Sequence, residues 1–531
     1  MFADATLVTP DGVSLMARIW TPEGVGPWPT LLMRQPYGRA IASTVTLPHP
    51  LWWTGQGFAV CVQDVRGQGD SEGVFKGFGQ EAVDTASTMA WLRERPECNG
   101  RIGLFGFSYQ GVTQLLAPKD CPAPDCLAPA MCGLAEREHW SCDGGAHWWH
   151  LGLGWGLQLA ALQAKRRNDQ AAWSELHTAL ESGRYLREGL SLLKRHDPKG
   201  MALRWLQQPA DQPEGWITHR PSESWLIKPM LLIGGWWDPH LQGLLDLFAQ
   251  AKRSGGSPEL HIGPASHLQW WPETTQILLD FFNQHLKGPT TRKQNKTAEI
   301  KLWNQTDASW SESNGHECSA HHWHLRSTGL ACLDLNDGQL LNPTIAGAGA
   351  CAIVHDPWRP VPSIGGHLSP TAGPCDRRGI DQRSDVAVFS SEPLQTSLQL
   401  LGRPRLKIQV SADQPAFDLC AALSRLPADR DEVQQLSTGV LRVRRISDPT
   451  STEITLELQP LFASLQRGDR LRLSLAGAAW PAIGINPGDG KQCYGPVNSD
   501  CRVITLYLKL EGASLQMAPL LLVQAGSTPA N

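Results

Sequence analysis

Ser108 lies in a short segment that could carry a nucleophile. Residues 106–111 read GFSYQG, so one glycine stands two residues before the serine and another three residues after it. Apolar residues at 101–105 predict a strand in front of this segment, and residues 111–116 are compatible with a helix behind it. A tight turn from a strand into a helix raises a serine hydroxyl above the edge of a sheet, where it can attack a carbonyl carbon. The second glycine comes one residue late for the strict G-x-S-x-G pattern.

A serine nucleophile needs a histidine as its base and a carboxylate to orient that histidine. Asp238 follows an apolar run at 230–235, and His267 follows another at 259–263. Both side chains are therefore expected at the carboxyl ends of strands. The chain order of serine, aspartate and histidine is that of an α/β-hydrolase triad. We predict that Ser108, Asp238 and His267 are the catalytic residues.

Other acidic and histidine residues fit this arrangement less well. Asp246 and His240 fall in a predicted helix or its first turn and should point away from the site. Asp64 precedes the serine, which is the wrong order for this fold. We expect Asp64 to form a buried ion pair with Arg66 that shapes its loop.

Hydrolysis through a serine also needs two hydrogen-bond donors for the oxyanion that develops on the carbonyl oxygen. The backbone N–H of Tyr109 follows the nucleophile directly. Tyr37 lies in the loop after the first predicted core strand, and its hydroxyl could donate the second hydrogen bond. We predict that Tyr37 and Tyr109 form the oxyanion hole.

Tryptophan is unusually frequent in this chain, with 22 residues and many adjacent pairs. Aromatic side chains fill cores, and they also line ligand pockets. Several pairs lie beside the predicted catalytic residues or in the helical segment before Asp238. The predicted substrate pocket contains Trp148, Trp149, Trp237 and Trp270.

The elements that would position these residues follow a regular order. Apolar runs at 30–33 and 57–63, a helical pattern at 80–95 and the strand before Ser108 predict a mostly parallel sheet with helices on both faces. Residues 144–205 are helical and rich in tryptophan, as expected of a cap. A polar linker is expected at 289–298, and strand patterns follow it. The predicted fold is an α/β-hydrolase core with an inserted helical cap and a C-terminal all-β jelly-roll sandwich.

The domain boundaries follow from these changes of pattern. The predicted domains are a first part of the core at 1–117, a cap at 118–226, a second part of the core at 227–288 and a jelly-roll domain at 289–531.

Composition argues against several classes of protein. The net charge is −4 and no run of like charges occurs, so we expect no nucleic-acid partner. The first residues lack the basic and apolar regions of a signal peptide, and no apolar run approaches the roughly 18 residues that span a bilayer, so we expect no membrane association. The 13 cysteines are an odd number without a secretion signal, which indicates reduced thiols in a cytoplasmic protein. We expect neither a metal nor a cofactor.

The motifs together resemble those of the CocE/NonD hydrolases, a family that includes bacterial cocaine esterase, α-amino acid ester hydrolases and X-Pro dipeptidyl-peptidases. The resemblance covers nearly the full length. It rests on residues 34–38 (RQPYG), 63–73 (QDVRGQGDSEG), 106–111 (GFSYQG), 235–238 (GWWD), 263–267 (GPASH), 385–394 (DVAVFSSEPL), 402–404 (GRP) and 479–487 (AWPAIGINP). The family pattern G-x-S-Y-x-G accounts for the late glycine, and its tyrosine in R-T-P-Y-G supports Tyr37 as an oxyanion donor.

The resemblance implies a serine hydrolase that forms an acyl-enzyme on a small-molecule ester or a short peptide. Ester hydrolysis is the first expectation, because the predicted pocket is aromatic. The α-amino acid ester hydrolases of this family hold the substrate ammonium with carboxylates, some shortly after the catalytic acid, and the absence of an acidic residue at 239–241 disfavours that branch. The alternative is an X-Pro dipeptidyl-peptidase, which needs an acidic anchor for a free N-terminus. Glu136, Glu138 and Asp143 could supply such an anchor. A non-catalytic carbohydrate- or ligand-binding protein on the same fold is a third reading, and whether the chain forms a homodimer stays open.

Overall fold

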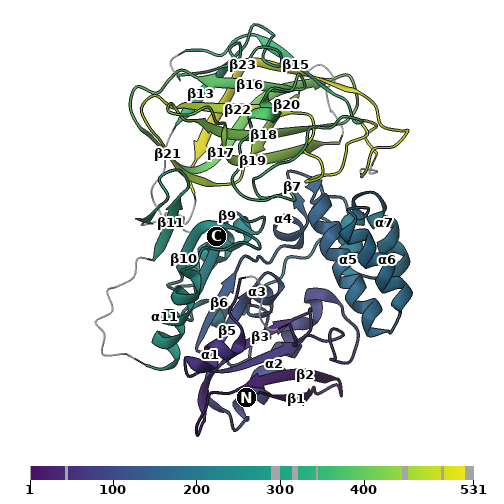
Figure 1. The fold of residues 1–531 in the computed structure, drawn as a ribbon, viewed down its shortest axis with the longest axis vertical. Helices are drawn as coiled ribbons and strands as arrows, with labels where there is room; N and C mark the ends of the chain where they lie inside the picture. The colour runs from purple at the N-terminus through teal and green to yellow at the C-terminus, as the bar shows by residue number, and fades with distance from the viewer. Residues whose placement is uncertain are drawn as a thin grey trace, which may run out of the picture.

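The computed structural model describes residues 2–41, 46–288, 299–313, 321–342, 345–444, 452–491 and 495–520. In Figure 1 a β-sandwich is stacked on one end of an α/β core, and a group of helices lies beside that core. The expected linker at 289–298 lies outside the described residues. Among the helices described, none combines the length and the apolar character needed to cross a membrane.

The first sheet has ten strands in the order β1-β2-β4-β3-β5-β6-β9-β10-β11-β12. Its central strands run parallel, as the alternation of strands and helices predicted. The β1–β2 hairpin adds an antiparallel edge. The strands are β1 Phe2–Val8, β2 Ser14–Trp20, β3 Trp28–Gln35, β4 Ala59–Asp64, β5 Cys98–Phe107, β6 Cys126–Ala130, β9 Leu231–Trp237, β10 Glu259–Ser266, β11 Ile300–Asn304 and β12 Ser309–Ser313.

Helices cover both faces of this sheet. Successive side chains of a strand point to opposite faces, and Leu31 of β3 packs in one core with Trp53 and Phe282, from α1 and α11. Leu32 packs in the other core with Leu244 of α10, and α2 covers the same face. Because both faces of the central strands are buried, their sequences are continuous apolar runs. The core helices are α1 Pro50–Gly55, α2 Glu81–Arg93, α3 Tyr109–Thr113, α10 Leu241–Arg253 and α11 Thr274–Leu286, with a short 3₁₀ turn, η1, at Gly77–Gln80.

The segment between β6 and β9 is mainly helical. Its long helices pack on one another around a separate apolar cluster that includes Leu153, Leu176 and Leu193. Near the end of α5, Gln163 and Arg166 donate hydrogen bonds to backbone carbonyls of the loop after β4, at 2.6 and 2.8 Å. The elements are α4 Glu136–Trp140, β7 Cys142–Asp143, β8 Ala146–His147, α5 Trp149–Arg166, α6 Gln170–Glu181, α7 Tyr185–His196, α8 Met201–Gln207 and α9 Glu223–Leu226.

The second sheet is an 11-stranded, largely antiparallel assembly that encloses its own core of leucine, isoleucine and valine side chains. It forms the sandwich in the upper part of Figure 1. Its elements are β13 His322–Arg326, β14 Gln339–Leu341, β15 Ala350–His355, α12 Arg378–Asp381, β16 Val386–Ser391, β17 Leu398–Ala412, β18 Phe417–Leu426, β19 Gln434–Val443, β20 Thr452–Glu457, β21 Leu461–Leu465, β22 Arg470–Ala476 and β23 Ile504–Ala518.

One expected boundary needs correction. Residues 299–303 were expected to open the jelly-roll domain at 289–531, but β11 pairs in parallel with β10, and β12 pairs with β11. Ile300 and Leu302 are buried in the core of the first sheet. These two strands therefore extend the first sheet, because burying their apolar face there also pairs the backbone groups along β10.

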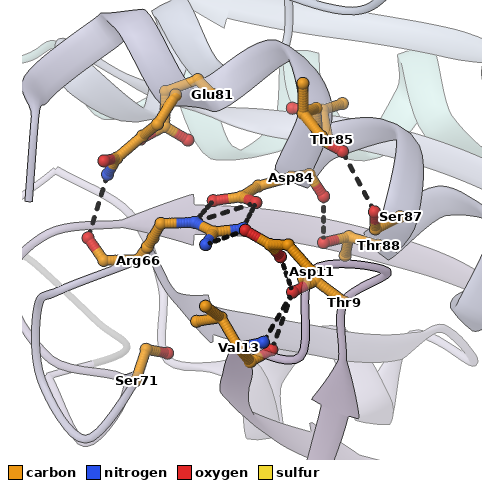
Figure 2. Close-up of polar contacts among 12 residues, drawn as sticks. Thr9, Asp11, Val13, Arg66, Ser71, Glu81, Asp84, Thr85, Ser87 and Thr88 are labelled. Carbon is orange, nitrogen blue, oxygen red and sulfur yellow. Dashed lines mark hydrogen bonds and ion pairs between the residues drawn. The ribbon is translucent and has the colours of Figure 1, made fainter. Parts of the chain in front are cut away.

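The loop after β4 also differs from expectation. Arg66 does not pair with Asp64. Figure 2 shows its guanidinium between Asp84 of α2 and Asp11 of the β1–β2 turn, with contacts of 2.6 and 2.8 Å. Asp64 instead lies 2.8 Å from the guanidinium of Arg39. Arg66 and Arg39 therefore tie the loop after β4 to different neighbours.

Candidate active site

Ser108 connects β5 to α3 in a backbone conformation that few residues other than glycine adopt. Its φ is 59° and its ψ is −127°. The flanking glycines leave room for this turn, because a Cβ on Gly106 would lie 2.5 Å from Cβ of Gln110. A Cβ on Gly111 would lie 3.0 Å from the carbonyl oxygen of Ala130 in β6. The late glycine is thus the position that packs against the neighbouring strand, and backbone strain of this kind is typical of functional sites.

His267 and Asp238 contact each other at the same edge of the sheet. Asp238 follows β9 and is fully buried, whereas the side chain of His267, after β10, is 24% exposed. Nδ1 of His267 lies 2.7 Å from Oδ1 of Asp238. An ionised carboxylate only accepts, so Nδ1 carries the proton and Nε2 keeps a lone pair. Ser108 and His267 line one cavity of about 500 Å³.

Tyr37 lines the same cavity, while the side chain of Tyr109 does not. The indole N–H of Trp155 donates to the hydroxyl oxygen of Tyr37 at 3.2 Å. Burial raises the pKa of Tyr37 to about 12, so the phenol keeps its proton. The hydroxyl of Tyr109 instead donates to Oε1 of buried Glu81 at 2.7 Å. Tyr109 could therefore serve the site only through its backbone N–H.

The predicted tryptophan pocket is largely wrong. Trp148 lines the cavity, but Trp149, Trp237 and Trp270 do not. Trp149 opens α5 with its ring buried against glycines of the sandwich. Trp237 belongs to the core of the first sheet, and Trp270 packs edgewise on Phe107 with ring centroids 5.5 Å apart. Adjacent tryptophans in a pair point in different directions, so nearness in the chain to a catalytic position does not bring a ring to the cavity.

Three other tryptophans form part of the cavity wall: Trp140, Trp155 and Trp205. The rings of Trp155 and Trp205 are stacked, with centroids 5.7 Å apart and planes at 26°. Trp140 lies against both of them. They come from α4, α5 and α8, so only the packing of the cap brings them together. The tryptophan content of the cap was the only sequence feature that pointed to these three residues as part of the cavity wall.

His240 was expected to point away from the site, and this expectation is wrong. It is the N-cap residue of α10 and lines the cavity beside His267, with ring centroids 4.8 Å apart. Its Nδ1 lies 2.6 Å from the backbone oxygen of His139. The N-cap precedes the helical turns, so its side chain stays at the edge of the sheet where the preceding strand ends.

Two models of known protein families match this chain. The model of the X-Pro dipeptidyl-peptidase (S15 family) matches residues 11–269. The model of the X-Pro dipeptidyl-peptidase C-terminal non-catalytic domain matches residues 252–498. The two matches together span the core, the helical segment and most of the sandwich.

Similar proteins agree with this assignment. Cocaine esterase of a Rhodococcus strain is 26% identical, with 90% of this chain and 91% of that protein covered. An aminopeptidase from a marine sediment archaeon shares the fold, with a TM-score of 0.72, 20% identity and coverage of 97% and 96%. So does a CocE/NonD family hydrolase of Staphylococcus aureus, with a TM-score of 0.71, 17% identity and coverage of 97% and 92%. The chain belongs to the CocE/NonD hydrolases of the X-Pro dipeptidyl-peptidase family, and it is a serine hydrolase.

Proposed function

We propose that the protein hydrolyses esters with an apolar or aromatic acyl group, through an acyl-enzyme formed on Ser108. His267 takes the hydroxyl proton of Ser108 and passes it to the leaving alcohol, while Asp238 orients the ring and stabilises its cation. The hydroxyl of Tyr37 and the backbone N–H of Tyr109 donate hydrogen bonds to the oxyanion. A water molecule, deprotonated by His267, then attacks the acyl-enzyme and releases the acid.

The residues that line the cavity beside Ser108 support the proposal of an apolar acyl group. Among the described residues that line it there is no aspartate, glutamate, lysine or arginine. The wall of Trp140, Trp155 and Trp205 adds apolar surface. A charged acyl group would lose its hydration there without gaining a counter-charge, which is unfavourable. The cavity therefore favours an uncharged, apolar acyl group.

The alternative, a dipeptidyl-peptidase acting on a free N-terminus, requires a carboxylate near the cavity. The three acidic residues considered for that role have other contacts. Glu136 lies 2.6 Å from Arg204, and Asp143 lies 3.0 Å from His367. Glu138 lines a different cavity, between α10 and the sandwich. These contacts, and the similarity to an esterase over nine-tenths of the chain, favour the ester.

A paired turnover assay tests this function. Purified protein is offered p-nitrophenyl benzoate and, separately, Gly-Pro p-nitroanilide, with Ser108→Ala as the blank. We expect rapid release of nitrophenol, little release of nitroaniline and no turnover by Ser108→Ala. Efficient cleavage of the anilide that is lost when its amine is acetylated would replace the proposal with a dipeptidyl-peptidase. Turnover that survives Ser108→Ala would exclude this serine as the nucleophile.

A further inference from the structure

Two buried glutamine side chains connect the nucleophile turn to the loop that carries Tyr37. Nε2 of Gln110, in α3, donates to Oε1 of Gln35 at 2.9 Å. Gln35 is the last residue of β3, and its Nε2 donates to the backbone oxygens of Gly38 at 3.1 Å and of Ile41 at 3.0 Å. Both glutamines are almost completely shielded from solvent. Their hydrogen bonds therefore run from the nucleophile turn to the residues that follow Tyr37 in the chain.

The backbone at both ends determines how the two amides are oriented. The backbone N–H of Phe107 donates to Oε1 of Gln110 at 3.2 Å, so the NH₂ group of Gln110 faces Gln35. Gln35 must then present its oxygen to Gln110, because an NH₂ group only donates. Its own NH₂ group is left for two carbonyl oxygens, which only accept. The two amides thus form one continuous chain of hydrogen bonds in which every donor meets an acceptor.

The chain turns sharply directly after Tyr37. Gly38 has a φ of 96°, which favours glycine, and its carbonyl oxygen also accepts the backbone N–H of Ile41 at 3.0 Å. Gln35 therefore binds both ends of this turn, and through its partner it fixes the turn relative to Ser108. A misplacement of about 1 Å in a catalytic group can cost about 10²-fold in rate. An oxyanion donor on this loop depends on such fixation, because it must meet the developing charge at hydrogen-bond distance.

We propose that Gln35 and Gln110 are positioning residues that aim the hydroxyl of Tyr37 at the oxyanion. They hold the phenol and the backbone N–H of Tyr109 in one frame, so that both donors meet the same oxygen. Gln35 lines the cavity, but both protons of its amide are donated to backbone carbonyls. It therefore acts through Tyr37 and not on the substrate. This inference rests on the oxyanion role that the proposed function gives to Tyr37, but not on the choice of an ester.

A double-mutant cycle separates this role from a general loss of structure. kcat and KM are measured for Gln35→Met and for Gln110→Met, each in the wild-type background and in the Tyr37→Phe background. Methionine is an unbranched side chain of similar length that has no amide to form these hydrogen bonds. We expect each glutamine variant to lower kcat at least tenfold in the wild-type background, with KM within threefold. In the Tyr37→Phe background the loss should be less than threefold, because no phenol hydroxyl remains to be positioned.

Gln114 supplies a matched control. It is an equally buried glutamine at the end of α3, and its Nε2 donates to the backbone oxygens of Gly106 at 3.0 Å and of Ala128 at 3.4 Å. It therefore ties the nucleophile turn to β5 and β6 instead of to the loop after β3. Whatever loss of kcat Gln114→Met causes should be the same factor in the wild-type and Tyr37→Phe backgrounds.

Amide hydrogen exchange gives a second readout that needs no substrate. The backbone N–H groups at 38–41 should exchange faster in Gln35→Met and in Gln110→Met than in the wild type, and at the wild-type rate in Gln114→Met. Unchanged exchange at 38–41 in both folded variants overturns the inference. Where Gln35→Met does not fold, Gln110→Met decides, because it leaves the hydrogen bonds of Gln35 to the turn intact.

The outcomes distinguish this inference from the proposed function. An equal loss of kcat in the two backgrounds overturns the positioning role even where esters are cleaved and Tyr37→Phe is impaired. If only Gly-Pro p-nitroanilide is turned over, the cycle is run on that substrate, and the expected coupling supports the positioning role while the ester proposal fails. If Tyr37→Phe alone leaves kcat within threefold, the oxyanion role of the phenol and this inference are both wrong.

Discussion

The indole N–H of Trp155 donates to the phenolic oxygen of Tyr37 across 3.2 Å. This hydrogen bond joins α5, a long helix of the cap, to the loop after β3. The phenolic oxygen accepts from Trp155, so its own proton remains available for another acceptor. In the proposed mechanism that acceptor is the oxyanion, and the bond fixes the direction in which the phenol donates.

Tyr37→Phe should therefore lower kcat on a p-nitrophenyl ester about 10²-fold, because one of the two oxyanion donors is lost. KM should change little, since the hydroxyl acts mainly in the transition state. Trp155→Phe is the companion variant. It keeps the phenol but loses the hydrogen bond that directs it, and we expect a decrease in kcat of less than tenfold. A loss below threefold in Tyr37→Phe would remove its hydroxyl from the site.

The ionisation of Tyr37 gives a pH prediction. Burial raises its pKa from 10.0 to about 12, so the phenol remains a donor at pH values where an exposed tyrosine is ionised. We expect kcat to show no decline with an apparent pKa near 10. Unfolding exposes Tyr37 and lets it release its proton above pH 10, so stability falls between pH 10 and 12. Circular dichroism at each pH must therefore accompany the kinetics, and a kcat decline near pH 10 in folded protein would contradict the prediction.

Strand patterns and chain order predicted much of the architecture. Apolar runs marked β5, β9 and β10, and a parallel sheet brings their carboxyl ends to one edge, which explains why Asp238 and His267 come into contact. The same patterns could not assign β11, because Ile300 and Leu302 could pack in either sheet. Only the pairing with β10 decides, and that pairing depends on contacts between distant parts of the chain.

The sequence patterns also could not predict the directions in which side chains point. The pattern around Trp148 and Trp149 is the same for both residues, yet one lines the cavity and the other is buried against the sandwich. His240 was missed because a helical pattern does not show where the first turn begins. Its position as the N-cap of α10 was the available signal. An aspartate–proline step directly before a histidine should prompt a check for such a helix start.

Tyr109 allows its backbone and its side chain to be separated. Tyr109→Phe keeps the backbone N–H but removes the hydrogen bond to Glu81, so kcat should stay within about threefold of the wild type. Stability should fall by about 1.5–3 kcal/mol, as is usual for a hydrogen bond to a charged group. Denaturant unfolding and ester kinetics measure the two effects. A loss of kcat as large as that of Tyr37→Phe, without unfolding, would mean that the side chain also acts in the reaction.

Arg66 gives a prediction about stability that involves no substrate (Figure 2). Its partner Asp84 is fully buried, whereas its other partner, Asp11, is 62% exposed. Arg66→Ala would leave the carboxylate of Asp84 buried without a counter-charge, which costs about 3–5 kcal/mol. Asp11→Ala removes a solvated ion pair and the hydrogen bond from the hydroxyl of Thr9. Both lie at the surface, so its melting temperature should stay close to that of the wild type.

The double variant Arg66→Leu/Asp84→Leu decides whether the unpaired charge is the cause. Replacing both members of a buried ion pair with apolar side chains of similar size is often neutral, whereas removing one member is not. The double variant should therefore regain most of the stability lost in Arg66→Ala, as measured by calorimetry of the first unfolding transition. If it remains as unstable as Arg66→Ala, the loss comes instead from the packing of the Arg66 side chain against Gly73, whose Cα hydrogen faces that chain. In that case Arg66→Met, which retains much of the aliphatic chain without the charge, should be more stable than Arg66→Ala.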